Sequence, residues 1–157
     1  MLEEMFNPNS IAVVGASNNR EKIGNILVRN IKTSYRGKLY PINLKEPEIE
    51  GLKAYGSLKE IGSKVDLVII SVPREAVVDV MMEAGEAGTR AAVIITSGFR
   101  EVDEKGKELE LKIMEVAKKY SIRFLGPNTM GLITLSMNAI NCDHLNKFKW
   151  LRDIDNN

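Results

Sequence analysis

The sequence has one cysteine, one histidine and no long apolar run. The single cysteine, Cys142, excludes a disulfide within the chain and fits a reducing compartment. The N-terminal segment MLEEMFNPNS is acidic and short of apolar residues, so it fits neither a signal peptide nor a membrane anchor. No stretch approaches the roughly 20 apolar residues that span a bilayer. These absences favour a soluble, cytoplasmic protein without a membrane partner.

An excess of charge of either sign is absent as well. The chain carries 22 basic and 21 acidic side chains, so its formal net charge is +1. Nucleic acids and anionic membranes attract surfaces with a strong positive field, and this balance gives no sign of either partner. Any anion site must therefore be local. The 157 residues are enough for one domain with a core of its own.

Short apolar runs recur along the chain and predict buried parallel strands. They lie at 11–14, 67–70, 91–95 and 122–125. The runs do not alternate with polar residues, a pattern that is typical of strands covered on both faces. A further strand is expected at 38–42, where Gly37 marks its start and Pro47 discourages regular structure after it.

Segments with helical spacing separate these strands, except between 38–42 and 67–70. Their apolar positions are Ile23, Ile26, Leu27 and Ile31 in the first, Val77, Val80, Met81 and Ala84 in the second, and Leu109, Ile113, Val116, Ala117 and Tyr120 in the third. Each stripe would face a sheet and leave charges such as Glu108 and Lys112 in water. Alternating strands and helices require right-handed crossovers, which predicts the α/β class with a doubly wound, Rossmann-like parallel sheet in a single domain. We expect this domain at 1–137 and a divergent or truncated C-terminal tail at 138–157.

The first predicted strand ends in a loop suited to an anion. The loop contains Gly15, Ala16 and Ser17, and Lys22, Ile23 and Gly24 begin the helix after it. Ligands of open parallel sheets bind beyond the carboxyl ends of the strands. Small residues let the backbone approach a phosphate, and a helix N-terminus favours negative charge. The loop therefore predicts a phosphate-bearing ligand, with an ordinary tight turn as the alternative.

The G-x-G-x-x-G fingerprint of dinucleotide-binding folds is missing, because Ser17 stands two positions after Gly15. The acidic residue expected near the end of the second strand is replaced by the segment PINLK at 41–45. Lys45 can contact an extra ribose phosphate, such as the 3′-phosphate of coenzyme A or the 2′-phosphate of NADP, or can simply be solvated. The NADP-binding Rossmann domain of an oxidoreductase therefore remains an alternative.

Six motifs follow one another along residues 11–137. They are VVGAS at 13–17, KIG at 22–24, YPIN at 40–43, VDLVIISVP at 65–73, ITSGFRE at 95–101 and LGPNTMG at 125–131. In type, order and spacing the sequence resembles the coenzyme A-binding domain of the NDP-forming acyl-CoA synthetases. This superfamily includes ADP-forming acetate–CoA ligase and the α subunit of succinyl-CoA synthetase.

The resemblance implies a site for coenzyme A or acyl-CoA at these loops. The implied contacts are Gly15, Ser17, Lys22 and Ile23 at the phosphates, Pro41, Asn43 and Lys45 near the adenosine, Val72 and Pro73 beside the adenine and pantetheine, Ser97 and Gly98 at the pantetheine arm, and Asn128 near the thiol end. Glu101 fits the family pattern G-F-x-E, but we assign no chemistry to it.

The family's reaction transfers phosphate through a histidine of a following domain and needs a separate ATP-grasp domain. The one histidine here, His144, lies in no family motif, so no catalytic residue is assigned. Cys142 and His144 supply at most two metal ligands, whereas a structural metal usually needs four, so no metal site is predicted.

The sequence therefore predicts binding of coenzyme A or acyl-CoA, as the coenzyme A-binding module of an ADP-forming acyl-CoA (acetate–CoA) ligase-like protein without a complete catalytic site of its own. A partner chain would then supply the catalytic or ATP-grasp part. Besides the NADP-binding alternative, a vestigial regulatory or interaction domain without a ligand stays open.

Overall fold

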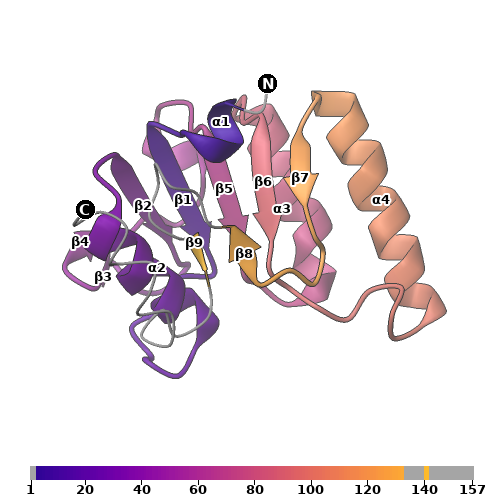
Figure 1. Ribbon diagram of the computed structural model, residues 1–157, viewed down its shortest axis with the longest axis horizontal. Coiled ribbons are helices and arrows are strands. Elements are labelled where there is room, and N and C mark those ends of the chain that lie inside the picture. Colours follow the sequence, from indigo (N-terminus) through magenta and orange to yellow (C-terminus); the bar gives the residue numbers. More distant parts are fainter. Residues whose placement is uncertain (1–2, 133–139, 142–157) are drawn as a thin grey trace, which may run out of the picture.

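The computed structural model describes residues 3–132 and 140–141 (Figure 1). Five parallel strands form the central sheet: β1 (Ser10–Val14), β2 (Lys38–Ile42), β5 (Leu67–Ile70), β6 (Ala91–Ile94) and β7 (Arg123–Leu125). Their spatial order is β2-β1-β5-β6-β7. The predicted fold class and all five predicted strands are thus confirmed. Strand β6 ends one residue before the predicted end, and β7 begins one residue after the predicted start.

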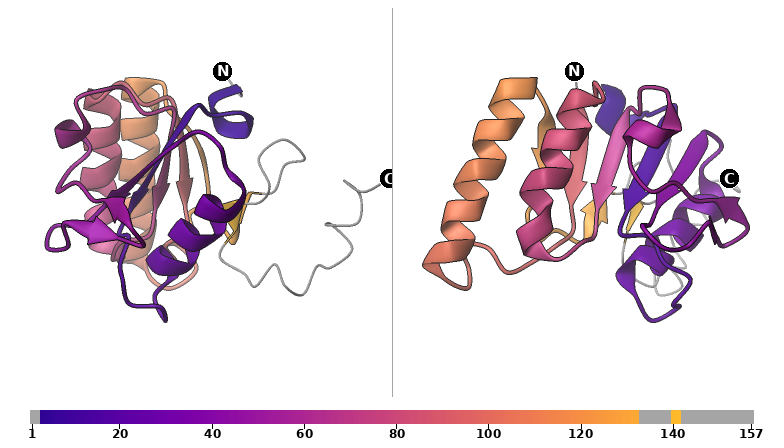
Figure 2. Two further views of the ribbon diagram at one scale, coloured as in Figure 1. Left: turned by 90° about the vertical axis from the view of Figure 1, so that its left-hand side faces the viewer. Right: turned by 180° about the vertical axis from the view of Figure 1, so that it is seen from behind.

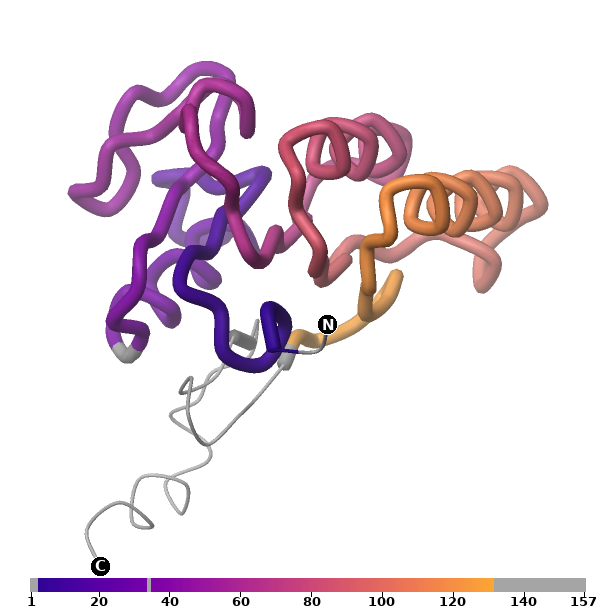
Figure 3. The backbone as a smooth tube through the Cα atoms, turned by 90° about the horizontal axis from the view of Figure 1, so that it is seen from above, coloured from indigo at the N-terminus to yellow at the C-terminus, as the bar shows by residue number. Residues whose placement is uncertain are grey.

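Helices cover both faces of this sheet (Figures 2 and 3). They are α1 (Glu3–Phe6), α2 (Ile23–Ser34), α3 (Arg74–Glu86) and α4 (Glu104–Tyr120). Leu27 of α2 packs in one buried cluster with Val13 of β1, whereas Val77 of α3 packs in a second cluster with Ala12. Because successive strand residues point to opposite faces, α2 and α3 must lie on opposite sides of β1. Helix α1 shares the face of α2, and α4 shares the face of α3.

The continuous apolar runs have the physical cause that the sequence predicted. Every residue of β1, β5 and β6 is buried, because each of these strands has a strand on either side and helices on both faces. One position of the first helical stripe was predicted wrongly. Ile23 is 46% exposed at the start of α2, while Leu27 and Ile31 are buried as expected.

Small elements lie outside the predicted pattern. They are β3 (Glu48–Ile49), β4 (Leu52–Lys53), the 3₁₀ turn η1 (Lys59–Ile61), β8 (Gly131–Leu132) and β9 (Ile140–Asn141). The β3–β4 hairpin begins directly after Pro47, so the expectation of irregular structure there was wrong. Its two-residue turn consists of Glu50 and Gly51, both with positive φ angles, 50° and 75°. Such primed turns match the twist of paired strands.

The proposed boundary between a domain at 1–137 and a tail at 138–157 stays a prediction. Apart from 140–141 in β9, the tail lies outside the described residues, and Cys142 and His144 lie there with it. Within the part of the chain that the structure describes, no helix has the length and apolar character needed to cross a bilayer.

Candidate functional site

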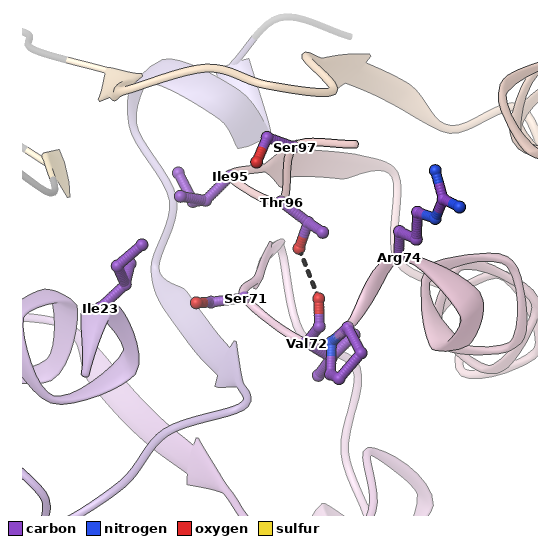
Figure 4. Close-up of a pocket in the computed structure, with 8 residues that line it drawn as sticks. Ile23, Ser71, Val72, Arg74, Ile95, Thr96 and Ser97 are labelled. Atoms are coloured by element: carbon purple, nitrogen blue, oxygen red, sulfur yellow. Dashed lines mark hydrogen bonds between the residues drawn. The ribbon is translucent and has the colours of Figure 1, made fainter. Parts of the chain in front are cut away.

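A pocket of about 290 Å³ lies beyond the carboxyl ends of β5 and β6, beside the first residue of α2 (Figure 4). Its lining consists of Ile23, Ser71, Val72, Pro73, Arg74, Ile95, Thr96 and Ser97. The chain leaves β1 toward β2 and then returns to the other side of β1 to form β5. In doubly wound sheets, ligands bind at this reversal, outside the carboxyl ends of the strands. The pocket lies at the place that this rule assigns to a ligand.

Two helices begin at the pocket, and neither is capped by a side chain at its N-terminus. Lys22 precedes α2 and Pro73 precedes α3, and neither side chain accepts a hydrogen bond from its helix. In contrast, Asp103 caps α4 by accepting from the Gly106 N–H. One N–H group of each first turn donates to a backbone carbonyl, Asn25 to Lys22 and Ala76 to Pro73. No N-cap side chain competes for the other first-turn N–H groups, and together with the helix dipoles they favour an anionic ligand.

Thr96 joins three of the loops around the pocket. Its hydroxyl donates a hydrogen bond of 2.7 Å to the carbonyl oxygen of Val72 (Figure 4). The carbonyl oxygen of Thr96 accepts a hydrogen bond of 2.9 Å from the backbone N–H of Asn128. The chain segments after β5, β6 and β7 are thereby held together, and Asn128 is fixed beside the pocket through its backbone.

Gly15 lets the end of β1 pass close to the segment after β5. A Cβ atom at this position would lie 2.1 Å from the carbonyl oxygen of Ser71, and the φ angle of Gly15 is 91°. Both observations require glycine, since a side chain would collide and an L-residue rarely adopts this φ. Gly15 therefore allows the first loop, residues 15–22, to pack closely against Ser71, which lines the pocket.

The Ser97–Gly98 turn is held by charged groups from both sides. Arg74 donates to the carbonyl oxygen of Gly98 and forms an ion pair of 3.0 Å with Asp103. The carboxylate of Glu101 accepts from the N–H of Gly98 at 2.8 Å and from the N–H of Phe99 at 3.1 Å. The bond from Gly98 is the largest cause that lowers the pKa of Glu101. Glu101, to which the sequence assigned no role, thus holds the backbone of this turn.

Apart from the pocket, the first loop and the segment after β2 form a cluster of hydrogen-bonded polar residues, called the second polar group below. Ser17 is only 5% exposed, and its hydroxyl donates to Glu46 at 3.3 Å. Asn43 donates from its side chain to the carbonyl oxygen of Ala16 at 2.7 Å and accepts from the backbone N–H of Lys45 at 2.7 Å. These bonds bring together Ser17, Asn43 and Lys45, which the sequence assigned to neighbouring parts of one ligand.

The structure distributes the twelve predicted site residues unequally. Ile23, Val72, Pro73 and Ser97 line the pocket. Gly15, Gly98 and Asn128 belong to the loops around it, and Ser17, Asn43 and Lys45 form the second polar group. Lys22 is the exposed residue before α2, and Pro41 is buried in β2 opposite Val13.

Sequence reasoning missed several residues of this site. Ser71, Arg74, Ile95 and Thr96 line the pocket, and Glu46 contacts the first loop. The four lining residues stand at or just after predicted strand ends, so their position along the chain was a usable signal. Glu46 lacked such a signal, because its contact depends on how the segment after β2 folds back over the first loop.

Comparison with known families and proteins gives consistent matches. A family model described as "CoA binding domain" matches residues 9–134. The α subunit of ADP-forming acetate–CoA ligase II from Pyrococcus furiosus is 46% identical over 138 residues, which are 88% of this chain and 30% of that protein. The 4-hydroxybutyrate–CoA ligase (ADP-forming) of Nitrosopumilus maritimus is 36% identical over 131 residues, 83% of this chain and 19% of that protein.

A solved structure agrees with these sequence matches. The dinucleotide-forming acetyl-coenzyme A synthetase 1 of Ca. Korarchaeum cryptofilum, in complex with phosphate and ADP, superposes with a TM-score of 0.85 and 42% sequence identity. The match covers 90% of this chain and 31% of that one. The chain thus spans less than a third of the length of these relatives.

Proposed function

Because this chain belongs to the CoA binding domain family, we propose that it binds coenzyme A or acyl-CoA as the coenzyme A-binding module of an ADP-forming acyl-CoA ligase-like protein. The observation that carries this proposal is the pocket at the β1–β5 reversal, where two helix N-termini without side-chain caps meet. Four residues that the family resemblance assigned to the coenzyme, Ile23, Val72, Pro73 and Ser97, line it.

Each part of the site suits one chemical part of the coenzyme. The N-terminus of α2 offers a positive dipole and backbone N–H groups to the phosphates. The first loop adds the hydroxyl of Ser17 and the N–H of Asn18, which bond to the carboxylate of Glu46 in this structure. The pocket between Val72 and Ser97 combines apolar walls with small polar groups, which suits the amide-bearing pantetheine arm. Asn128 stands on the loop after β7, whose backbone is bonded to Thr96, so the thiol end would extend in this direction.

The phosphoryl-transfer step, in this proposal, belongs to other domains or to a partner chain. The P. furiosus relative is named as the α subunit of its ligase, and this chain covers 30% of it. Among residues 3–132 there is no histidine to carry a phosphoryl group. The described residues would instead bind and orient coenzyme A so that its thiol reaches an acyl group activated elsewhere.

Calorimetric titration of the purified 157-residue protein tests the proposal. Coenzyme A, NADP and NAD are compared under the same conditions, and coenzyme A is expected to bind with clear preference. Preference for a nicotinamide cofactor would overturn the proposal in favour of an oxidoreductase domain. A protein that binds none of the three, and whose melting temperature coenzyme A does not raise, would have a vestigial site, because a ligand selective for the folded state must stabilise it.

A further inference from the structure

The carboxylate of Glu46 accepts hydrogen bonds from two donors of the first loop. One of its oxygens accepts from the hydroxyl of Ser17 at 3.3 Å, and the other accepts from the backbone N–H of Asn18 at 3.0 Å. A carboxylate bound through both oxygens to a hydroxyl and a backbone N–H uses the same kind of contact that a phosphate makes at such a loop. The first loop therefore already holds an anion, and that anion belongs to the chain itself.

The position of this carboxylate is fixed by the segment before it. The backbone N–H of Glu46 donates to the side-chain oxygen of Asn43 at 3.0 Å, and the amide nitrogen of Asn43 lies 3.5 Å from the Glu46 carboxylate. Asn43 in turn donates to the carbonyl oxygen of Ala16. Glu46 is thus held over the first loop by a residue that is itself bonded to that loop.

Glu46 forms no ion pair with a cationic side chain among the described residues. Within residues 3–132, the groups that donate to its carboxylate are Ser17, Asn18 and Asn43, all of them uncharged. A second anion that approached the same donors would therefore meet the negative charge of Glu46. Two unit charges repel each other substantially at contact distance, even in water.

We propose that Glu46 is a resident anion that a phosphate of the ligand must displace from Ser17 and Asn18. This inference rests on the proposed function, because it takes the first loop as a phosphate-binding element of a coenzyme A site. Displacement makes binding a competition between two anions for one set of donors. Only a ligand whose phosphate outcompetes a carboxylate gains the first-loop contacts, so Glu46 limits affinity and selects for highly charged phosphate ligands.

Replacing Glu46 by glutamine tests the displacement. The variant keeps the size of the side chain and one acceptor oxygen but loses the charge. Coenzyme A is expected to bind Glu46→Gln at least about fivefold more tightly than the wild type at low salt, the factor that corresponds to two unit charges roughly 4 Å apart in water. Calorimetric titration of the whole 157-residue chain measures both affinities.

Glu48→Gln is the matched control. Glu48 is exposed, stands two residues further along the same segment, and its carboxylate makes none of the first-loop bonds among the described residues. Its replacement changes the net charge by the same amount and should alter coenzyme A affinity by less than about twofold. Equal tightening in both variants would mean a general charge effect and would overturn the inference.

Two further outcomes are separated by the same experiment. Weaker or unchanged binding by Glu46→Gln would show that Glu46 supports the loop for the ligand and is not displaced by it. Glu46→Ala, which removes both oxygens, must shift affinity in the same direction as Glu46→Gln, and thermal unfolding checks that both variants fold. A wild-type chain that does not bind coenzyme A at all would instead refute the proposed function itself.

Discussion

Gly24 in α2 and Gly15 at the end of β1 are packed so closely that a Cβ atom on Gly24 would lie 1.9 Å from the carbonyl oxygen of Gly15. The neighbouring atom is backbone, so it cannot move aside as a flexible side chain would. The start of α2 is thereby pressed against the first loop, and this contact directs the helix N-terminus toward the pocket. Any side chain at position 24 must push the two apart.

The Gly24→Ala substitution is therefore expected to destabilise the protein by about 3 kcal/mol or more, the upper range of overpacking effects. Coenzyme A binding should weaken as well. Gly62→Ala is the control, because Gly62 has a φ angle of 70° and a Cβ atom added there would have no neighbouring atom within 4 Å. Backbone strain alone should lower the free energy of unfolding of the control by about 1–2 kcal/mol. Urea denaturation measures both, and equal effects would contradict the role of close packing.

The hydroxyl of Thr96 is expected to contribute to both stability and binding. Thr96→Val keeps the shape of the side chain but leaves the carbonyl oxygen of Val72 without its donor, which should cost about 1–3 kcal/mol. The loosened turn after β5 should also weaken coenzyme A binding. Thr33→Val removes an exposed hydroxyl that donates to Arg29 within α2 and should change either quantity little. Comparable losses in the two variants would argue against a linking role for Thr96.

The ion pair between Arg74 and Asp103 predicts a specific pH dependence. Arg74, and next the N–H of Gly106, lower the pKa of Asp103 below its usual value of 3.8. Since the folded-state pKa is depressed, ionised Asp103 stabilises the fold above pH 3.8, and this contribution is lost as the pH falls through the folded-state pKa.

Asp103→Asn separates the ion pair from the helix cap, because asparagine caps helices as well as aspartate does. The variant should be less stable than the wild type at neutral pH, and the difference should shrink below about pH 4. Urea denaturation across this pH range measures the difference. If the difference in stability between the wild type and Asp103→Asn stayed constant down to the lowest pH, the charge of Asp103 would not be its cause.

Lys45 is expected to add a modest, salt-sensitive contribution to ligand binding. It is exposed next to the second polar group, so Lys45→Met should weaken coenzyme A binding by about fivefold or less. Added salt should reduce this loss, because exposed charges are screened. The exposed Lys64 lies just before β5, at the amino end of the sheet, and Lys64→Met serves as the control. An effect of Lys45→Met that does not depend on salt would contradict an ionic contact.

The chain alone should not complete the ligase reaction. Incubated with ATP, acetate and coenzyme A, it is expected to form no acetyl-CoA and to carry no acid-labile phosphate, because its one histidine, His144, lies in none of the motifs that carry the family resemblance. His144→Ala should leave coenzyme A affinity unchanged. Formation of acetyl-CoA that the His144→Ala substitution abolishes would show that the segment around His144 belongs to an active site.

Much of the fold was predictable because its strands are covered on both faces. Burial forces β1, β5 and β6 to be apolar throughout, which distinguishes them from the amphipathic helices. The order β2-β1-β5-β6-β7 could not be read from the residues, since the buried strands have the same kind of pattern. The β3–β4 hairpin escaped prediction because its turn is Glu50–Gly51, where glutamate adopts a positive φ that sequence rules assign mainly to glycine and asparagine.

The site was predictable where it depends on local sequence. Small residues after the strands identified Gly15, Ser97 and Gly98, since a strand end followed by a small residue leaves the backbone open. Contacts between segments distant in sequence were not predictable. Glu46 lies 29 residues after Ser17, and only the tertiary fold brings its carboxylate to the backbone N–H of Asn18. The contacts of Glu101 are local, with Gly98 and Phe99, but the sequence showed Glu101 only as part of a motif.

The one-sided placement of the site also identifies where the molecule can be modified. Gly62, Ser63 and Lys64 are exposed in the loop before β5, at the end of that strand opposite the pocket. The four residues of β5 keep this loop roughly 13 Å from the pocket wall. Exposed loop tips tolerate inserted residues well. An affinity handle or a fluorescent reporter inserted at Ser63 would therefore leave both the sheet and the ligand loops in place.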